Sequence, residues 1–278
     1  MKKNILKVLL IAIICLTLSF ATSCKKNDKV IRVCASELPH ADVLRNVVAP
    51  LLEEQGYELK VYVLDWTLQN DAVASGDYDA NYFQHIPYLE TYEGSTKLFA
   101  TCKVHYEPLG IYRGKSSGSL QEGKTFAICN DESNAARAFE LLKQKGVISV
   151  VPVDDEGKLT FIGSKWTSPE GVTITLIAED LLVQAMPDYD FVCLPCNTAY
   201  TGNVSASKKV AYEDDPVQVS LKANVLAVRQ NDYNNNAKYQ TKIDALTNAL
   251  LSQEVADYIY EKYNGAITCD ATSQIDLR

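Results

Sequence analysis

Runs of apolar residues separated by mixed polar stretches divide this chain into alternating strands and helices. Short apolar runs such as VIRVCAS (30–36), KTFAIC (124–129) and FVCLP (191–195) predict buried strands. Between such runs apolar residues recur every three or four positions, as in ADVLRNVVAPLLEEQG (41–56), which ends at a glycine suited to stop a helix. This alternation predicts the α/β class, with parallel sheets covered by helices.

Two stretches share a sequence pattern that is consistent with two lobes. VASGDYDANYFQ (73–84) and VQAMPDYDFVCLPCN (183–197) each lead from a helix end through Asp-Tyr-Asp into an apolar strand. Ligands of open α/β sheets bind beyond the carboxyl ends of the strands, so each lobe would offer one strand end to a shared cleft. Because the shared tripeptide is short, a chance repeat stays open as the alternative.

The first residues have the order of an export signal. Three lysines precede the apolar run VLLIAIICLTLSF (8–20), and the small residues ATSC (21–24) follow it. The run is shorter than the ~20 residues of a membrane span. Its ending resembles a bacterial lipobox, which predicts a signal peptide at 1–23, a lipidated Cys24 and a tether at 24–30. An ordinary signal peptide with a chance cysteine is the alternative.

Charge and cysteine content narrow the possible functions. The net charge is −8 and no strongly basic stretch follows the signal, so we expect no nucleic-acid partner. Six cysteines remain beyond Cys24, and CLPC (193–196) has the spacing of a thiol redox motif, which keeps a thiol–disulfide oxidoreductase open as an alternative. The three histidines (40, 85 and 105) lack metal-ligand spacing, so we expect neither a metal nor a cofactor.

A polar loop after one strand offers a candidate anion site. In CNDESNAARAFELL (129–142), Ser133 can cap a helix whose first turn contains Arg137. Helix N-termini favour anions, so backbone amides and the guanidinium could converge on a ligand carboxylate. A cation opposes the macrodipole at that end, which predicts little loss of stability on its removal. The alternative is a solvated surface arginine.

An aromatic stretch offers a candidate pocket wall. ANYFQHIPYLE (80–90) holds Tyr82, Phe83, His85 and Tyr88 around a proline that breaks any regular periodicity. Trp66, just past another predicted strand, could add a further ring. Aromatic clusters in clefts favour a ligand with an apolar or soft side chain. Filling of the core beneath the cleft is the alternative for any single ring.

Four ordered motifs together resemble the NlpA lipoprotein family, the methionine-binding lipoproteins of bacterial ABC importers. They are SGDYDANYFQHIPYL (75–89), CNDESNAARAFELL (129–142), NTAY (197–200) and VSLKANVLAVR (219–229). The resemblance covers most of the chain beyond the signal. It implies a two-lobed periplasmic-binding-protein fold, type II-like, with two hinge crossings. Lobe I would comprise 31–108 plus 223–278, and lobe II 109–222.

The resemblance also assigns roles to residues. Arg137 would hold an amino acid's carboxylate, and Asn197 and Asn224 would bond to its polar end. Phe83, His85 and Tyr88 would wall the side-chain pocket, around the thioether of L-methionine. Trp66 stands where the family commonly has tyrosine, which leaves a related amino acid or a small peptide open as the ligand.

The expected protein is thus a binding lipoprotein and not an enzyme. The resemblance implies an ABC importer permease as its partner, anchoring to the lipid bilayer through acylated Cys24, a position in the cell envelope and a monomeric state. A surface lipoprotein with an adhesive role and an idle cleft is the remaining alternative.

Overall fold

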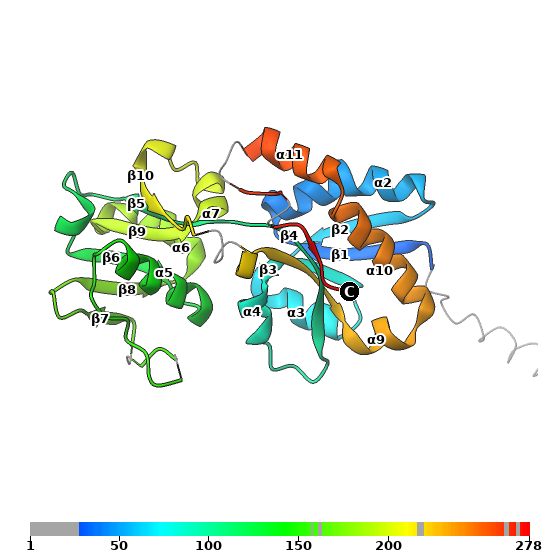
Figure 1. The fold of residues 1–278 in the computed structure, drawn as a ribbon, viewed down its shortest axis with the longest axis horizontal. Coiled ribbons are helices and arrows are strands. Elements are labelled where there is room, and N and C mark those ends of the chain that lie inside the picture. Colours follow the sequence, from blue (N-terminus) through cyan, green and yellow to red (C-terminus); the bar gives the residue numbers. More distant parts are fainter. Residues whose placement is uncertain (1–27, 157, 161–162, 216–219, 264–266, 271–272) are drawn as a thin grey trace, which may run out of the picture.

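The structure is a computed structural model that describes residues 28–156, 158–160, 163–215, 220–263, 267–270 and 273–278. Within these residues the strands form two mixed sheets of six strands each, which belong to the two halves of the molecule in Figure 1. Each sheet carries its own helices. The protein therefore has two α/β lobes, and we call the half with the first sheet lobe I and the other lobe II.

Lobe I is built on a sheet with the order β12-β4-β11-β3-β1-β2. Its strands are β1 (Val30–Ala35), β2 (Glu58–Val63), β3 (Ala80–His85), β4 (Leu98–His105), β11 (Asn224–Arg229) and β12 (Ile275–Asp276). β1 pairs in parallel with β2 and β3, whereas β11 runs antiparallel to β3 and β4. The expectation of a parallel sheet is thus wrong for this half of the sheet. β4 leads out to the other lobe and β11 returns from it, so no crossover helix joins them to their neighbours.

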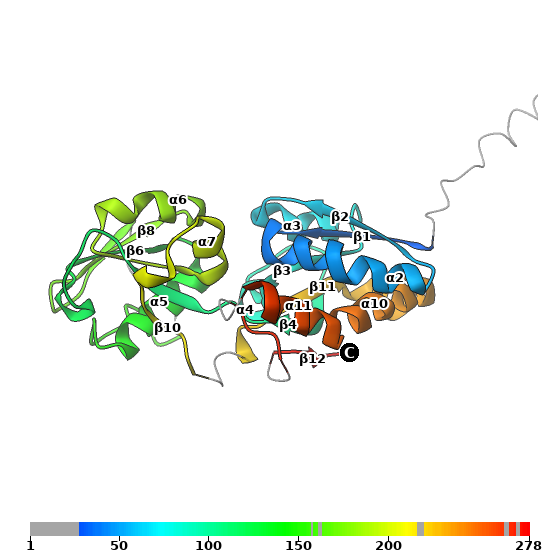
Figure 2. The same ribbon diagram turned by 90° about the horizontal axis from the view of Figure 1, so that it is seen from above.

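Helices cover both faces of this sheet. They are η1 (Glu37–Ala41), η2 (Leu44–Val48), α2 (Ala49–Glu54), α3 (Trp66–Ala74), α4 (Ile86–Glu90), α9 (Gln230–Asn235), α10 (Ala237–Leu250) and α11 (Gln253–Tyr263). In Figure 2, α2, α10 and α11 lie close together, and α3 packs on the opposite face of the sheet from them. Val33 joins the core under the first group, and its neighbour Cys34 joins the core under α3 and α4. Burial of both faces explains why the central strands β1 and β11 have mostly apolar sequences.

The predicted helix at 41–56 is confirmed, since the backbone is helical from residue 41 to residue 54, with π-helical hydrogen bonding over Leu44–Val48. Two π-helical turns, η1 and η2, precede α2, and Leu38 inside the first has extended backbone angles. The predicted stop is confirmed, because Gly56 has a φ of 76°, a conformation that only glycine adopts at low cost.

Lobe II repeats the layered plan with the sheet order β10-β5-β9-β6-β8-β7. Its strands are β5 (Leu109–Arg113), β6 (Thr125–Cys129), β7 (Lys165–Thr167), β8 (Thr173–Ile177), β9 (Phe191–Pro195) and β10 (Lys209–Tyr212). Its helices are η3 (Leu120–Glu122), α5 (Glu132–Gln144), α6 (Glu179–Ala185), η4 (Met186–Asp188), α7 (Cys196–Thr201) and η5 (Ala206–Lys208). β6 is parallel to β8 and β9, so these three strands end at one edge of the sheet. α5 packs on one face, and α6 with α7 packs on the other.

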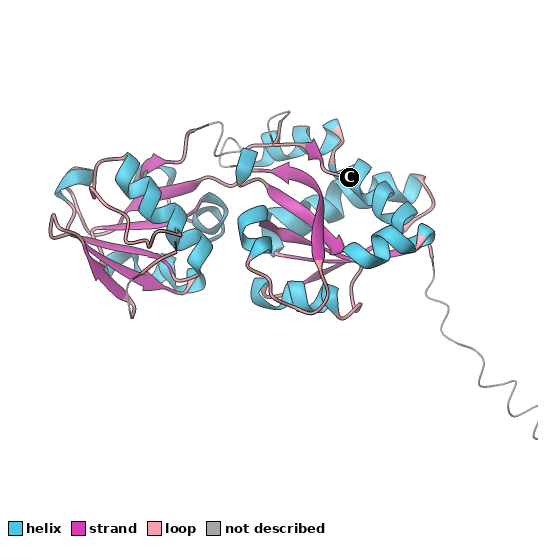
Figure 3. Cartoon of the chain, turned by 60° about the horizontal axis from the view of Figure 1, so that its bottom comes forward, coloured by secondary structure: helices cyan, strands magenta, loops and turns pink. Residues whose placement is uncertain are grey.

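The chain passes between the lobes twice. β4 of lobe I is followed by β5 of lobe II, and β10 of lobe II is followed by β11 of lobe I. Figure 3 shows the lobes joined along one side, with their helices and strands otherwise separate. This is the two-lobed fold predicted from the sequence, and the residue boundaries given there remain a proposal.

Candidate functional site

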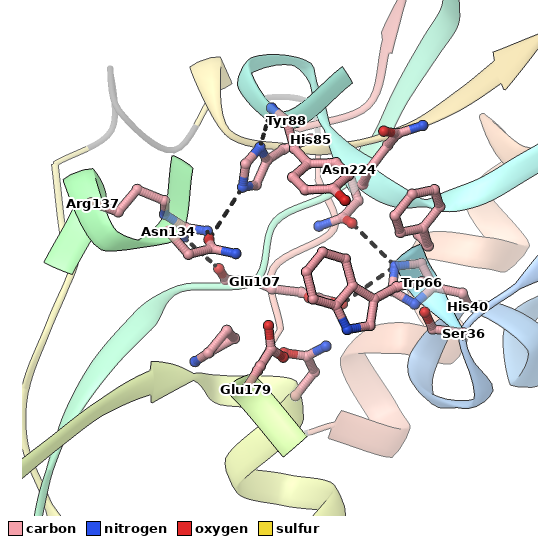
Figure 4. A pocket seen from close by; sticks show the side chains of 14 residues that line it. Ser36, His40, Trp66, His85, Tyr88, Glu107, Asn134, Arg137, Glu179 and Asn224 are labelled. Carbon is pink, nitrogen blue, oxygen red and sulfur yellow. Dashed lines mark hydrogen bonds and ion pairs between the residues drawn. The ribbon is translucent and has the colours of Figure 1, made fainter. Parts of the chain in front are cut away.

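A pocket opens between the lobes and is lined from both of them (Figure 4). It holds about 550 Å³ of space, part of which is open to solvent. This size suits a small ligand. Its lining residues are Ser36, His40, Trp66, Phe83, Gln84, His85, Tyr88, Glu107, Asn134, Arg137, Glu179, Pro195, Asn197 and Asn224.

Three aromatic rings form the lobe I wall of this pocket. Trp66 is the first residue of α3, which Asp65 caps by accepting a hydrogen bond of 2.9 Å from Thr67 N. The Trp66 and Tyr88 rings meet edge to face with centroids 5.4 Å apart, and Phe83 meets Tyr88 in the same way at 5.9 Å. Edge-to-face contacts hold such rings in place. Tyr82, the remaining ring of the stretch, is fully buried and bonds to His105 instead of lining the pocket.

His85 joins this wall to lobe II as a neutral ring. Its Nδ1 accepts a hydrogen bond of 3.2 Å from Tyr88 N, so Nε2 carries the proton. Nε2 lies 3.3 Å from Asn134 Oδ1 in lobe II, and it donates this bond. Burial and the charge of Arg137 lower the pKa of His85 to about 4. At neutral pH the ring therefore adds a hydrogen-bond donor but no charge.

Arg137 is bound within the protein more fully than the sequence predicts. Nε and Nη2 donate to the two carboxylate oxygens of Glu213 at 3.2 and 2.6 Å. Nη2 also donates to the Glu107 carbonyl at 3.0 Å, and Nη1 donates to Asn134 Oδ1 at 3.1 Å. Both partners of the ion pair are 6% exposed. Four of the five guanidinium N–H groups are thus occupied, which leaves one on Nη1 for a ligand.

The start of α5 also differs from the sequence prediction. The cap is Asp131, whose Oδ1 accepts a hydrogen bond of 2.9 Å from Asn134 N, and not Ser133. The helix begins at Glu132, so Arg137 lies in its second turn. Asp and Ser are equally favourable N-cap residues, so residue type alone does not decide between Asp131 and Ser133. The polar loop ends at Asp131, and the helix therefore begins directly after it. The helix terminus is therefore occupied by a carboxylate of the protein itself.

A buried hydrogen-bond network forms the lobe I floor of the pocket. Tyr82 donates to His105 Nδ1, and His105 Nε2 then donates to Glu107 Oε1 at 2.9 Å. His40 Nε2 lies 3.1 Å from Asn224 Oδ1 and 3.5 Å from Glu107 Oε1, both of which are acceptors. Burial lowers the pKa of His40 to about 4 and that of His105 to about 3. The network orients Asn224 and leaves its amide nitrogen for the pocket.

The fold brings together two groups of potential metal ligands, each with one member from a distant part of the sequence. They are His40 with His105 and Glu107, and Cys129 with Asp131 and Glu179. The first group is held by the hydrogen bonds just described. In the second, Cys129 Sγ donates to Asp131 Oδ2 at 2.8 Å. Hydrogen bonding accounts for both arrangements without an ion.

The cysteines of the C-x-x-C motif are poorly suited to redox chemistry. All six cysteines of the described residues are free thiols. Cys193 is buried inside β9, and Cys196 accepts a hydrogen bond of 3.2 Å from the Tyr112 hydroxyl. Burial raises the pKa of both thiols, whereas a redox thiol needs a low pKa. The geometry gives no support to the oxidoreductase alternative.

All seven predicted ligand-binding residues line this one pocket, although their contact with a ligand stays a prediction. They are Trp66, Phe83, His85, Tyr88, Arg137, Asn197 and Asn224. Sequence reasoning did not single out His40, Glu107, Asn134 or Glu179. For Glu179 a signal existed, because it directly follows a strand and opens a helix at the ligand-binding edge of a parallel sheet.

The membrane anchor predicted at Cys24 lies outside the described residues. None of the helices in the described part of the chain has the length and hydrophobicity that crossing a membrane requires.

Comparison with known proteins agrees with this architecture. Residues 31–269 match the family model of the NlpA lipoproteins. The chain belongs to the NlpA lipoprotein family. Over 250 residues this NlpA lipoprotein is 34% identical to the methionine-binding lipoprotein MetQ of Bacillus subtilis, an alignment that covers 87% of this chain and 89% of the relative.

Solved structures of similar proteins share the two-lobed fold of this NlpA lipoprotein. A nutrient-binding protein of Burkholderia cenocepacia bound to methionine aligns with a TM-score of 0.73 and 29% identity, covering 86% of this chain and 99% of that one. A periplasmic substrate-binding protein of an ABC transporter from Coxiella burnetii aligns with a TM-score of 0.70 and 25% identity, covering 86% and 100%. The fold is that of the substrate-binding proteins, and these relatives are not enzymes by name.

Proposed function

We propose that this NlpA lipoprotein captures L-methionine between its lobes and delivers it to an ABC importer. The observation that carries the proposal is the pocket, where an aromatic wall of lobe I faces polar groups of lobe II. Sulfur against aromatic edges contributes about 0.3–1.5 kcal/mol per contact, enough to select a thioether among side chains of similar size. The names of the Bacillus and Burkholderia relatives point to the same ligand.

Each part of the ligand would meet a matching part of the pocket. The side chain would lie against Trp66, Phe83 and Tyr88. The remaining N–H of Arg137 and the Asn224 amide nitrogen would donate to the carboxylate, because neither donor has an acceptor among the residues that the structure describes. Binding of this kind needs no chemical step, so we propose that the protein acts without catalysis.

The same proposal covers the location of the protein. Acylation of Cys24 would hold a monomer at the membrane of the cell envelope, facing the periplasm or the outside. The importer permease would take the ligand there when the lobes open.

Thermal unfolding with different amino acids tests the ligand. L-Methionine should raise the melting temperature of the stripped protein more than L-alanine or L-glutamate at equal concentration, because a ligand that binds the folded state more tightly stabilises it more. Phe83→Ala should remove most of that difference without unfolding the protein. Tyr260→Ala is the matched control, since Tyr260 is 76% exposed and does not line the pocket. Equal shifts from all three amino acids would contradict L-methionine as the ligand.

A further inference from the structure

The lobe II side of the pocket presents two hydrogen-bond acceptors, the carboxylate of Glu179 and the side-chain oxygen of Asn197. Glu179 is the first residue of α6, and Figure 4 shows its carboxylate pointing into the pocket. Asn197 follows at the start of α7, and its buried Oδ1 has no hydrogen-bond partner within the described residues. A buried acceptor without a donor costs about 1–3 kcal/mol, so such an atom at a pocket wall indicates a ligand donor.

The Glu179 carboxylate is fixed in position from its own lobe. The Thr198 hydroxyl donates to Oε1 at 2.6 Å, and Cys129 Sγ lies 3.9 Å from Oε2. Thr198 belongs to the same helix as Asn197, so this bond also links the starts of α6 and α7. The two acceptors are therefore held on neighbouring elements, at the carboxyl ends of β8 and β9.

The surroundings of Glu179 carry an excess of negative charge. Burial raises the pKa of Glu179 to about 7; the Thr198 bond and Arg137 oppose the rise, and the charges of Asp131 and Glu107 add to it. Glu107 is also raised to about 7, mainly by burial. Arg137 is the one permanent cation among the described lining residues, and its charge is balanced by Glu213. The pocket therefore lacks a cation opposite its carboxylates.

We propose that Glu179 binds the ammonium group of the ligand, together with Oδ1 of Asn197. This inference rests on the proposed function and adds to it the residue that selects ligands with a free α-amine. An ammonium has three N–H donors and one positive charge, which match a carboxylate, an amide oxygen and the negative surroundings. The ligand carboxylate would then lie towards Arg137 and Asn224, away from Glu179.

The same ammonium occurs in a free amino acid and at the N-terminus of a short peptide. L-Methionine and L-methionylglycine both have it, whereas 4-(methylthio)butanoic acid is methionine without it. Binding of these three probes to stripped protein, measured by calorimetry, separates the ammonium contribution from the rest of the ligand. Whichever of L-methionine and L-methionylglycine binds more tightly identifies the ligand class, free amino acid or short peptide.

Glu179→Gln should lower the affinity for the more tightly bound amine probe about tenfold to a hundredfold. This range corresponds to the free energy of one hydrogen bond to a charged group. The affinity of the Glu179→Gln variant for 4-(methylthio)butanoic acid should not fall, since that ligand has no ammonium group for Glu179 to bind. The glutamine can still accept the Thr198 bond, so the fold is preserved. Glu179→Asp, which keeps the charge, should restore part of the affinity.

Asp180→Asn is the matched control, because it removes one negative charge from the exposed next residue of the same helix. It should leave all three affinities within about twofold, as expected for a screened surface charge. Parent-like binding of the amine probes by Glu179→Gln would overturn this inference and leave the proposed function standing. A parent protein that binds none of the probes would overturn both.

Discussion

The charge of Arg137 is balanced inside the protein before any ligand arrives. Glu213 lies against it at 2.6 Å and also accepts from Lys222 at 2.8 Å and from the Tyr106 hydroxyl at 2.7 Å. Burial alone would raise the pKa of Glu213, but Arg137 and Lys222 lower it to about 2. Arg137 thus stabilises the ligand-free protein as well as offering one N–H to the pocket.

Arg137→Ala should therefore lower the free energy of unfolding of the stripped protein by about 3 kcal/mol. That is the lower end of the range for breaking a buried ion pair, because Lys222 still faces Glu213. Denaturant unfolding at pH 7 measures the change. Arg113→Ala is the matched control, since Arg113 donates to the carbonyls of Ser116 and Gly118. A loss below about 1 kcal/mol for Arg137→Ala would instead agree with the macrodipole expectation from the sequence.

At the scale of elements, the carboxyl ends of parallel strands in lobe II deliver the polar side of the pocket. β6 leads to Asp131 and Asn134, β8 leads to Glu179, and β9 leads to Asn197. Each polar residue follows its strand by two to five positions, at the start of the next helix. The strand ends therefore determine where these side chains lie, and the cap of α5 also positions Asn134 against His85 and Arg137.

Asp131→Ala should cost about 0.5–2 kcal/mol of stability, the usual cost of losing an N-cap. It should also weaken ligand binding, because Asn134 Nδ2 donates to Asp131 Oδ2 at 3.1 Å. Ser133→Ala tests the cap predicted from the sequence and should change neither quantity. Thermal unfolding and calorimetry of the two variants measure both effects. A larger loss for Ser133→Ala would show that the cap lies where the sequence pattern suggested.

At the scale of the whole molecule, two crossings let the lobes share one pocket while each keeps its own core. Large apolar side chains such as Leu44 in lobe I and Phe139 in lobe II are fully buried in separate clusters. Full burial of a side chain of this kind contributes about 1.5–3 kcal/mol, so each lobe is stabilised mainly from within. The pocket walls can then move relative to each other without disruption of either core.

Anchoring is also a property of the whole molecule. Cys24→Ala should release the protein into the soluble exported fraction, because stable attachment takes two or more acyl chains and no other anchor is predicted. Fractionation of cells followed by detection of the protein measures this. Cys15→Ala is the control, since Cys15 is removed with the predicted signal peptide. The Cys15→Ala protein should stay in the membrane fraction. Retention of the Cys24 variant in the membrane fraction would contradict lipid anchoring.

The sequence by itself determined the α/β class, most elements and part of the pocket lining. Helix and strand periods are local, and turn signals such as Gly56 act within one turn of chain, so they can be read without the fold. The aromatic stretch and the polar loop after β6 are also local, whereas Asn197 and Asn224 were assigned by the family resemblance; all seven predicted residues line one pocket.

Only the tertiary structure decided the charge balance and the direction of side chains at this site. Glu213 pairs with Arg137 across 76 residues, a contact that no local pattern contains. Neighbours Tyr82 and Phe83 point to opposite faces of β3, and the packing of lobe I decides that the first is buried and the second meets the pocket. Propensity acts over one turn or one pleat, whereas ion pairing and burial depend on segments that meet only in the fold.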